Sequence, residues 1–65
     1  MPTIRVTVPR SAWSVEEKAD IVSRLTEGLA AVGSEAGKGD LRPHINIHIE
    51  ETAEGGYAMG GRVVG

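Results

Sequence analysis

The residue at position 2 carries the most unusual chemistry in this chain. The sequence begins MPTIRVTV, so Pro2 directly follows the initiator methionine. Initiator methionine is normally removed before a small residue, and we therefore expect a mature chain that begins at Pro2 with a free secondary amine. An α-amino group has a pKa of about 7.7–8.0, which burial or nearby cations lower. At neutral pH a useful fraction of such an amine is a free base that can move a proton.

Two histidines and two glutamates near the middle of the chain are the other groups that could do chemistry. His44 and His48 lie four residues apart on a predicted strand, so about 13 Å separates them, too far for one metal ion within one chain. We expect both to lie at an interface or in solvent. Glu50 and Glu51 could serve as acid–base residues, but we interpret them first as a charged, solvated strand end. No metal and no cofactor is predicted.

Length and composition limit how these groups can be held in place. The chain has 65 residues, no cysteine and a net charge of −2. We expect one domain over residues 1–65, without disulfides, that is marginally stable alone and is stabilised by oligomerisation. The charge balance argues against binding to nucleic acid or an anionic membrane. With neither a signal peptide nor a membrane span apparent, we expect a cytoplasmic protein.

Two segments alternate as strands and one is periodic as a helix. Residues 2–8 place Pro2 and three β-branched residues on one face, and Pro9 ends the strand. SVEE at residues 14–17 has the capping-box form and predicts the start of a helix that ends at Gly33. The apolar stripe of that helix is predicted to be Ile21, Val22, Leu25, Leu29 and Val32.

A second alternation begins at His44, with Ile45, Ile47 and Ile49 on one face. A strand, a helix and a strand in this order normally form a right-handed crossover with parallel strands. The tail EGGYAMGGRVVG predicts a short hairpin or arm lying on a neighbouring subunit. The predicted fold is therefore α/β (α+β), one β-α-β unit with a C-terminal hairpin, which assembles into larger sheets because its edges are bare.

These features in this order resemble the 4-oxalocrotonate tautomerase family in its short form. The resemblance is carried by PTIRVTV, SVEEKADIVSRLTEGL, INIHIEE and GGYAMGG, and it covers nearly the whole chain. It implies a homohexamer built as a trimer of dimers, with active sites around each N-terminal proline at subunit interfaces. It also implies a keto–enol tautomerase in which Pro2 is the general base.

The resemblance places further site residues, and the sequence departs from the family pattern at two of them. The family arginine of the first loop falls at Ala12 or Trp13, and the arginine of the second strand matches Asn46. The pocket aromatic is matched by Tyr57. Arg10 and, after it, Arg42 are the nearest cationic replacements. We expect Asn46 to donate a hydrogen bond to a substrate oxygen and Arg10 to hold a carboxylate.

The departures define the expected substrate and a rival function. With one cationic anchor or none, a small enol or 2-oxo monoacid is expected before a dicarboxylate. Met59 stands where dehalogenating relatives carry a water-activating glutamate, which argues against hydrolytic dehalogenation. The rival is a hexamer of the same fold that has lost its catalytic arginines and serves as a binding or structural protein. Whether Pro2 acts as a base or as a nucleophile toward a carbonyl stays open.

Overall fold

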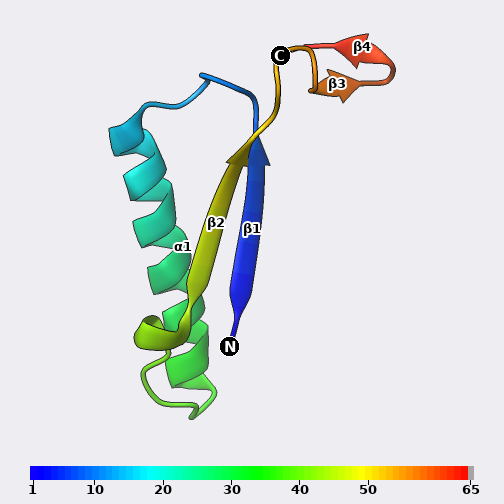
Figure 1. Ribbon diagram of the computed structural model, residues 1–65. Helices are drawn as coiled ribbons and strands as arrows, with labels where there is room; N and C mark the ends of the chain where they lie inside the picture. Colours follow the sequence, from blue (N-terminus) through cyan, green and yellow to red (C-terminus); the bar gives the residue numbers. More distant parts are fainter. Residues whose placement is uncertain (65) are drawn as a thin grey trace.

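The computed structural model describes residues 1–64 and places one long helix beside a pair of parallel strands (Figure 1). The chain runs through β1 (Thr3–Val8), α1 (Val15–Glu35), a 3-10 turn η1 (Arg42–His44) and β2 (Asn46–Glu51). It ends in two short strands, β3 (Ala58–Met59) and β4 (Arg62–Val63). The predicted β-α-β unit with a C-terminal hairpin is confirmed.

Strands β1 and β2 pair in parallel, with Thr3 opposite Asn46 and Val8 opposite Glu51. Apart from Glu51, the strand residues that face α1 are partly or fully buried, and their neighbours on the other face are exposed, as the alternation predicts. The open face is therefore polar. Arg5 and Glu50 form an ion pair across it, with 3.4 Å between Nη1 and Oε1.

Helix α1 begins where its capping box predicts. The amide of Glu17 donates to Ser14 Oγ at 3.1 Å, and the amide of Ser14 donates to Glu17 Oε1 at 2.8 Å. Two orphan amides of the first turn are thereby satisfied. Glu16 and Glu17 also lie at the positive end of the helix dipole.

The predicted end of the helix at Gly33 is wrong, because the helix continues to Glu35. Gly33 is buried, and a Cβ built on it would lie 2.5 Å from Leu41 Cδ1, so the missing side chain makes room for Leu41. The left-handed residue that follows the helix is Gly37, with φ 75°. Val22, 36% exposed, and Val32, 60% exposed, lie outside the buried stripe predicted for them.

The second strand also starts later than predicted. His44 belongs to η1, where Pro43 lies in the first turn and the amide of His44 donates to the carbonyl of Leu41 at 2.8 Å. Proline fixes the backbone for such a turn. The strand proper then begins at Asn46, so that His44 and Ile45 of the predicted alternation lie before the part that pairs with β1.

The C-terminal hairpin stands apart from the β-α-β unit (Figure 1). Met59 pairs with Arg62 around Gly60 and Gly61, which both have positive φ, as a two-residue type I′ turn requires. Neither β3 nor β4 contacts α1, β1 or β2. The hairpin is held only by its own hydrogen bonds and by the connection at residues 52–57.

The core is small. Within residues 1–64 the only buried apolar side chains are Val8, 7% exposed, and Ala30, 5% exposed. Met59, Val63 and Val64 on the hairpin are at least half exposed. Within the same residues, no helix has both the length and the apolar character needed to cross a bilayer.

Candidate functional site

The start of the parallel strands brings Pro2 and Asn46 together. Pro2 is half-buried just before β1, and the amide of Asn46 donates to its carbonyl oxygen at 3.0 Å. The Asn46 carboxamide lies against the N-terminal residue, with 3.9 Å between Nδ2 and Met1 Sδ. Because Met1 is 87% exposed, removing it would leave both the Pro2 nitrogen and the Asn46 amide open to solvent. Removal of Met1 would thus place a free amine beside a neutral hydrogen-bond donor.

Arg10 and Tyr57 lie beyond the other end of the strands. Arg10 follows β1, and Tyr57 directly precedes β3. The six residues of β1 span about 20 Å, so within one chain these side chains are separated from Pro2 by roughly the length of the strand. One chain therefore does not gather the predicted site residues into one site.

Arg10 is paired with one carboxylate, which follows β2 in the chain. Its Nη1 lies 3.3 Å from Glu54 Oε2. The neighbouring residue Ser11 has a φ of 61°, uncommon for a residue with a side chain, and its amide donates to Glu51 Oε2 at 3.4 Å. Glu51 Oε1 is also 3.5 Å from Lys18 Nζ, so this carboxylate ties the loop to the helix. The structure gives Glu51 a positioning contact and places Arg10 in an exposed ion pair.

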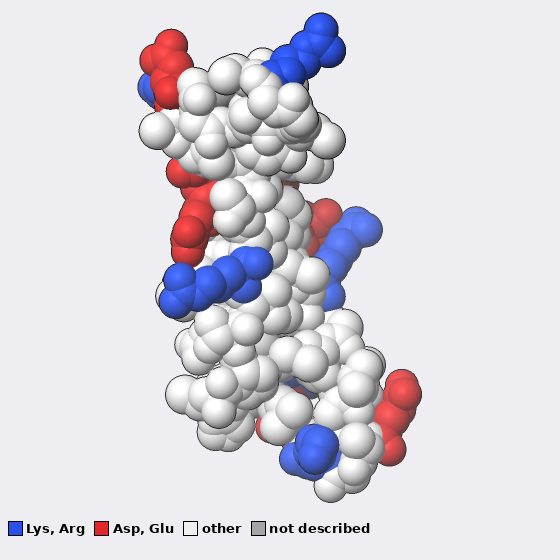
Figure 2. Space-filling model, turned by 90° about the vertical axis from the view of Figure 1, so that its right-hand side faces the viewer, with Lys and Arg blue, Asp and Glu red and all other residues white. Residues whose placement is uncertain are grey.

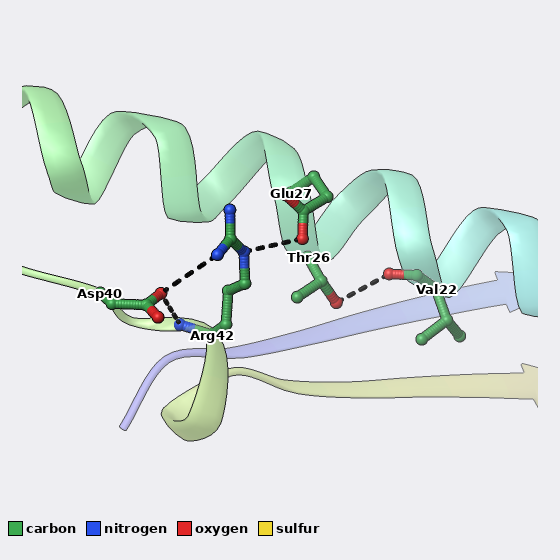
Figure 3. Close-up of polar contacts among 5 residues, drawn as sticks. All are labelled: Val22, Thr26, Glu27, Asp40 and Arg42. Atoms are coloured by element: carbon green, nitrogen blue, oxygen red, sulfur yellow. Dashed lines mark hydrogen bonds and ion pairs between the residues drawn. The ribbon is translucent and has the colours of Figure 1, made fainter.

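Arg42 also forms ion pairs with carboxylates of its own chain (Figure 3). It reaches from η1 toward α1, with Nε 2.8 Å from Glu27 Oε2 and Nη1 3.9 Å from Asp40 Oδ1. The hydrogen bond to Glu27 and the charges of both carboxylates raise the pKa of Arg42, so the guanidinium stays charged. These groups line an open hollow of about 530 Å³ beside α1. With two carboxylates against one guanidinium, the hollow is poorly suited to a substrate carboxylate.

The remaining polar candidates stay separate. His48 lies on the open face of the sheet opposite Arg5, and His44 lies in η1. Within residues 1–64, no group of three or more histidine, aspartate or glutamate side chains could hold a metal ion. Figure 2 looks at one side of the molecule and shows charged side chains scattered over it without a single-sign patch.

Sequence reasoning missed the carboxylates that neutralise the two candidate arginines. Glu54 is far from Arg10 in the chain, and Glu27 is far from Arg42, so no helical or strand spacing links either pair. Only Asp40, two residues before Arg42, could have been predicted locally. An aspartate at that spacing commonly accepts a hydrogen bond from the backbone amide two residues later.

Comparisons with models of protein families, with curated proteins and with solved structures found no match for this chain. The resemblance to the 4-oxalocrotonate tautomerase family therefore rests on the sequence motifs alone.

Proposed function

We propose that this protein is a tautomerase-type isomerase in which the amine of Pro2, exposed by removal of Met1, is the general base. The observation that carries the proposal is the placement of Asn46 beside the N-terminus, through the bond from its amide to the Pro2 carbonyl and the contact of its carboxamide with Met1. An amine and a hydrogen-bond donor, far apart in sequence, thereby share one end of the sheet.

The proposed reaction moves one proton within an enol or 2-oxo acid. The Pro2 amine accepts a proton from the substrate and returns it to another atom, so an enol becomes its ketone and nothing is consumed. Negative charge develops on the substrate oxygen during this transfer. The Asn46 carboxamide is a donor that can stabilise this charge without adding a charge of its own. The chemistry calls for no cofactor.

The proposed site is completed by a second copy of the chain. Pro2 and Tyr57 lie toward opposite ends of the strands, so a neighbouring copy must supply the aromatic wall. Self-association is supported by the very small core and by the apolar side chains of Met59, Val63 and Val64 that are left exposed. We propose a homo-oligomer, and the family resemblance makes a hexamer its expected size.

A specific observation favours a second candidate function. Arg10 and Arg42, the two expected anchors, are each engaged with carboxylates of the same chain. An oligomer of this fold without a free anchor would be a binding or structural protein. Arg10 is in an exposed pair worth at most about 1 kcal/mol, which a substrate carboxylate can displace, so we place the isomerase first.

The test is ketonisation of phenylenolpyruvate followed from pH 5 to pH 9. The chain is short enough for chemical synthesis, which allows a form that begins at Pro2 to be compared with one that keeps Met1. In the longer form the Pro2 nitrogen is an amide and is not basic. We expect it to be at least about a hundredfold slower, because a positioned general base contributes about 10²- to 10⁴-fold.

Two further variants complete this experiment. Pro2→Ala keeps a primary amine in place of the secondary amine and should lose most of the rate, whereas Thr3→Ala should keep it. Oligomer size and intact mass are measured for every form. Equal rates for the two synthetic forms would exclude Pro2 as the base, and complete inactivity of all intact oligomers would favour the binding or structural role.

A further inference from the structure

The hairpin places an arginine on the same face as its aromatic residue. Met59 pairs with Arg62, and the amide of Val64 donates to the carbonyl of Tyr57 at 2.8 Å, so Tyr57 lies opposite Val64. Directly opposed residues of an antiparallel pair point to the same side, and successive residues alternate. Tyr57, Met59, Arg62 and Val64 therefore share one face of the hairpin.

Tyr57 and Arg62 are diagonal neighbours on this face. Diagonal neighbours in an antiparallel pair lie about 7–8 Å apart, a separation that aromatic and long side chains bridge. A planar ligand that lies against the Tyr57 ring can thus also reach the Arg62 guanidinium. Tyr57 is half-buried and Arg62 is exposed, which leaves the polar end of the pair accessible.

Arg62 differs from the other arginines in its surroundings. Arg5, Arg10, Arg24 and Arg42 each form an ion pair with a carboxylate of this chain. Among residues 1–64, no aspartate or glutamate oxygen lies within 4 Å of Arg62. A guanidinium has a planar fork of donors that matches a carboxylate. Arg62 is therefore the arginine best placed to accept an external anion.

Lys38 is the other lysine or arginine side chain without an ion-pair partner among the described residues. It lies in the loop after α1 and not on the hairpin that carries Tyr57. Its ammonium is a point charge without the planar fork of a guanidinium. It serves as a matched control, because its removal changes the net charge of the chain by the same amount.

We infer that Arg62 binds the substrate carboxylate while Tyr57 lies against the adjacent conjugated carbons. This inference rests on the proposed function and narrows its substrate to a planar, conjugated monocarboxylate. The hairpin does not contact the strands or the helix of its own chain, so a site that combines this pair with Pro2 needs the hairpin of a neighbouring copy. Arg62 takes the anchoring role that Arg10 was expected to fill.

The test compares phenylenolpyruvate with its methyl ester, which keeps the conjugated skeleton and lacks the charge. For Arg62→Ala we expect KM of the acid to rise about tenfold or more with kcat little changed, because the lost contact is a charge-assisted hydrogen bond. Arg62→Lys should restore part of the loss. Turnover of the ester should not change in either variant, and Lys38→Ala should behave as wild type with both substrates.

Several outcomes would overturn the inference. An unchanged KM for the acid in Arg62→Ala does so, and so does an equal loss with acid and ester. If Arg62→Ala dissociates the oligomer, Arg62→Lys decides: an unchanged KM in an intact oligomer overturns the anchor, and a raised KM for the acid alone supports it.

A separate binding measurement distinguishes failure of the anchor from failure of the proposed function. If wild type does not turn over, binding of phenylpyruvate is measured by calorimetry. Loss of binding in Arg62→Ala and not in Lys38→Ala supports the anchor, and equal binding in all three proteins overturns it. For an active enzyme, Pro2→Ala and Arg62→Ala chains are refolded together. A return of the lower wild-type KM for the acid in the mixed oligomers supports a site shared between copies, and a KM that stays at the Arg62→Ala value in verified mixed oligomers overturns that part.

Discussion

The β-α-β unit and the C-terminal hairpin differ in what holds them. In the unit, helix and strands cover one another, and the open face of the sheet is polar. In the hairpin, a glycine turn fixes the chain reversal, yet the exposed side chains include Met59, Val63 and Val64. An isolated two-stranded hairpin is at best marginally stable in water. Contacts within one chain therefore account for the placement of the β-α-β unit, but not for the placement of the hairpin.

The largest effect expected from this difference is on association. If the hairpin packs on another copy, Val63→Asp would bury a carboxylate in the interface. It would also remove the apolar side chain of Val63, which is 61% exposed in the single chain. We expect about a hundredfold weaker association or more, since the cost of an unpaired buried charge adds to the lost apolar contact. Analytical ultracentrifugation over a range of concentrations measures it.

Val15→Asp is the matched control, because Val15 is 75% exposed and begins α1, where an acidic residue is favourable. It should leave association unchanged. If both variants associate as wild type does, the hairpin is not part of an interface.

The next largest effect concerns two glycines of α1 and tests the packing of the unit itself. Gly33→Val should lower the free energy of unfolding by about 1–3 kcal/mol, because its side chain would overlap Leu41. Gly28→Ala should raise it by up to about 1 kcal/mol, since nothing lies within 4 Å of the added Cβ and alanine favours the helix. Urea denaturation at fixed protein concentration measures both.

The sign of the change in unfolding free energy for Gly28→Ala shows whether α1 also contacts another chain. A loss of stability in Gly28→Ala would mean that a neighbouring chain approaches the helix at this position. The expected gain would mean that the helix only tolerates this glycine.

The smallest effect is expected at the helix cap, where all partners lie within four residues. Ser14→Ala removes the acceptor for the Glu17 amide and should cost about 1 kcal/mol of unfolding free energy. Ser23→Ala, within the exposed part of the helix, should have little effect or stabilise slightly. Equal thermal midpoints for the two variants would contradict a stabilising role for the cap.

Sequence reasoning was most successful where a local pattern determines the structure. The alternation of residues 2–8 and the capping box at Ser14 predicted the first strand and the helix start, because their partners are periodic or lie one turn away. The order of elements predicted the parallel pairing of the strands. The two glycines before Arg62 favoured the hairpin turn.

The errors arose where a distant residue decides. Gly33 taken alone is typical of a helix end, but it lies inside the helix. Its lack of a side chain makes room for Leu41, which is distant in the sequence. The candidate arginines were named from their positions in the chain, and the carboxylates that neutralise them come from other elements. The site residues were predicted individually, and only Pro2 and Asn46 lie together within one chain.

The pairing of β1 with β2 also has a consequence for biosynthesis. Strand β1 has no partner until Asn46–Glu51 has been made, after the whole of α1 and η1. During that interval an alternating β-rich segment is available to the same segment of another nascent chain. Arg5, at the middle of the strand, places a charge in this segment and disfavours such pairing. We therefore expect the residue that later pairs with Glu50 to disfavour aggregation of the growing chain as well.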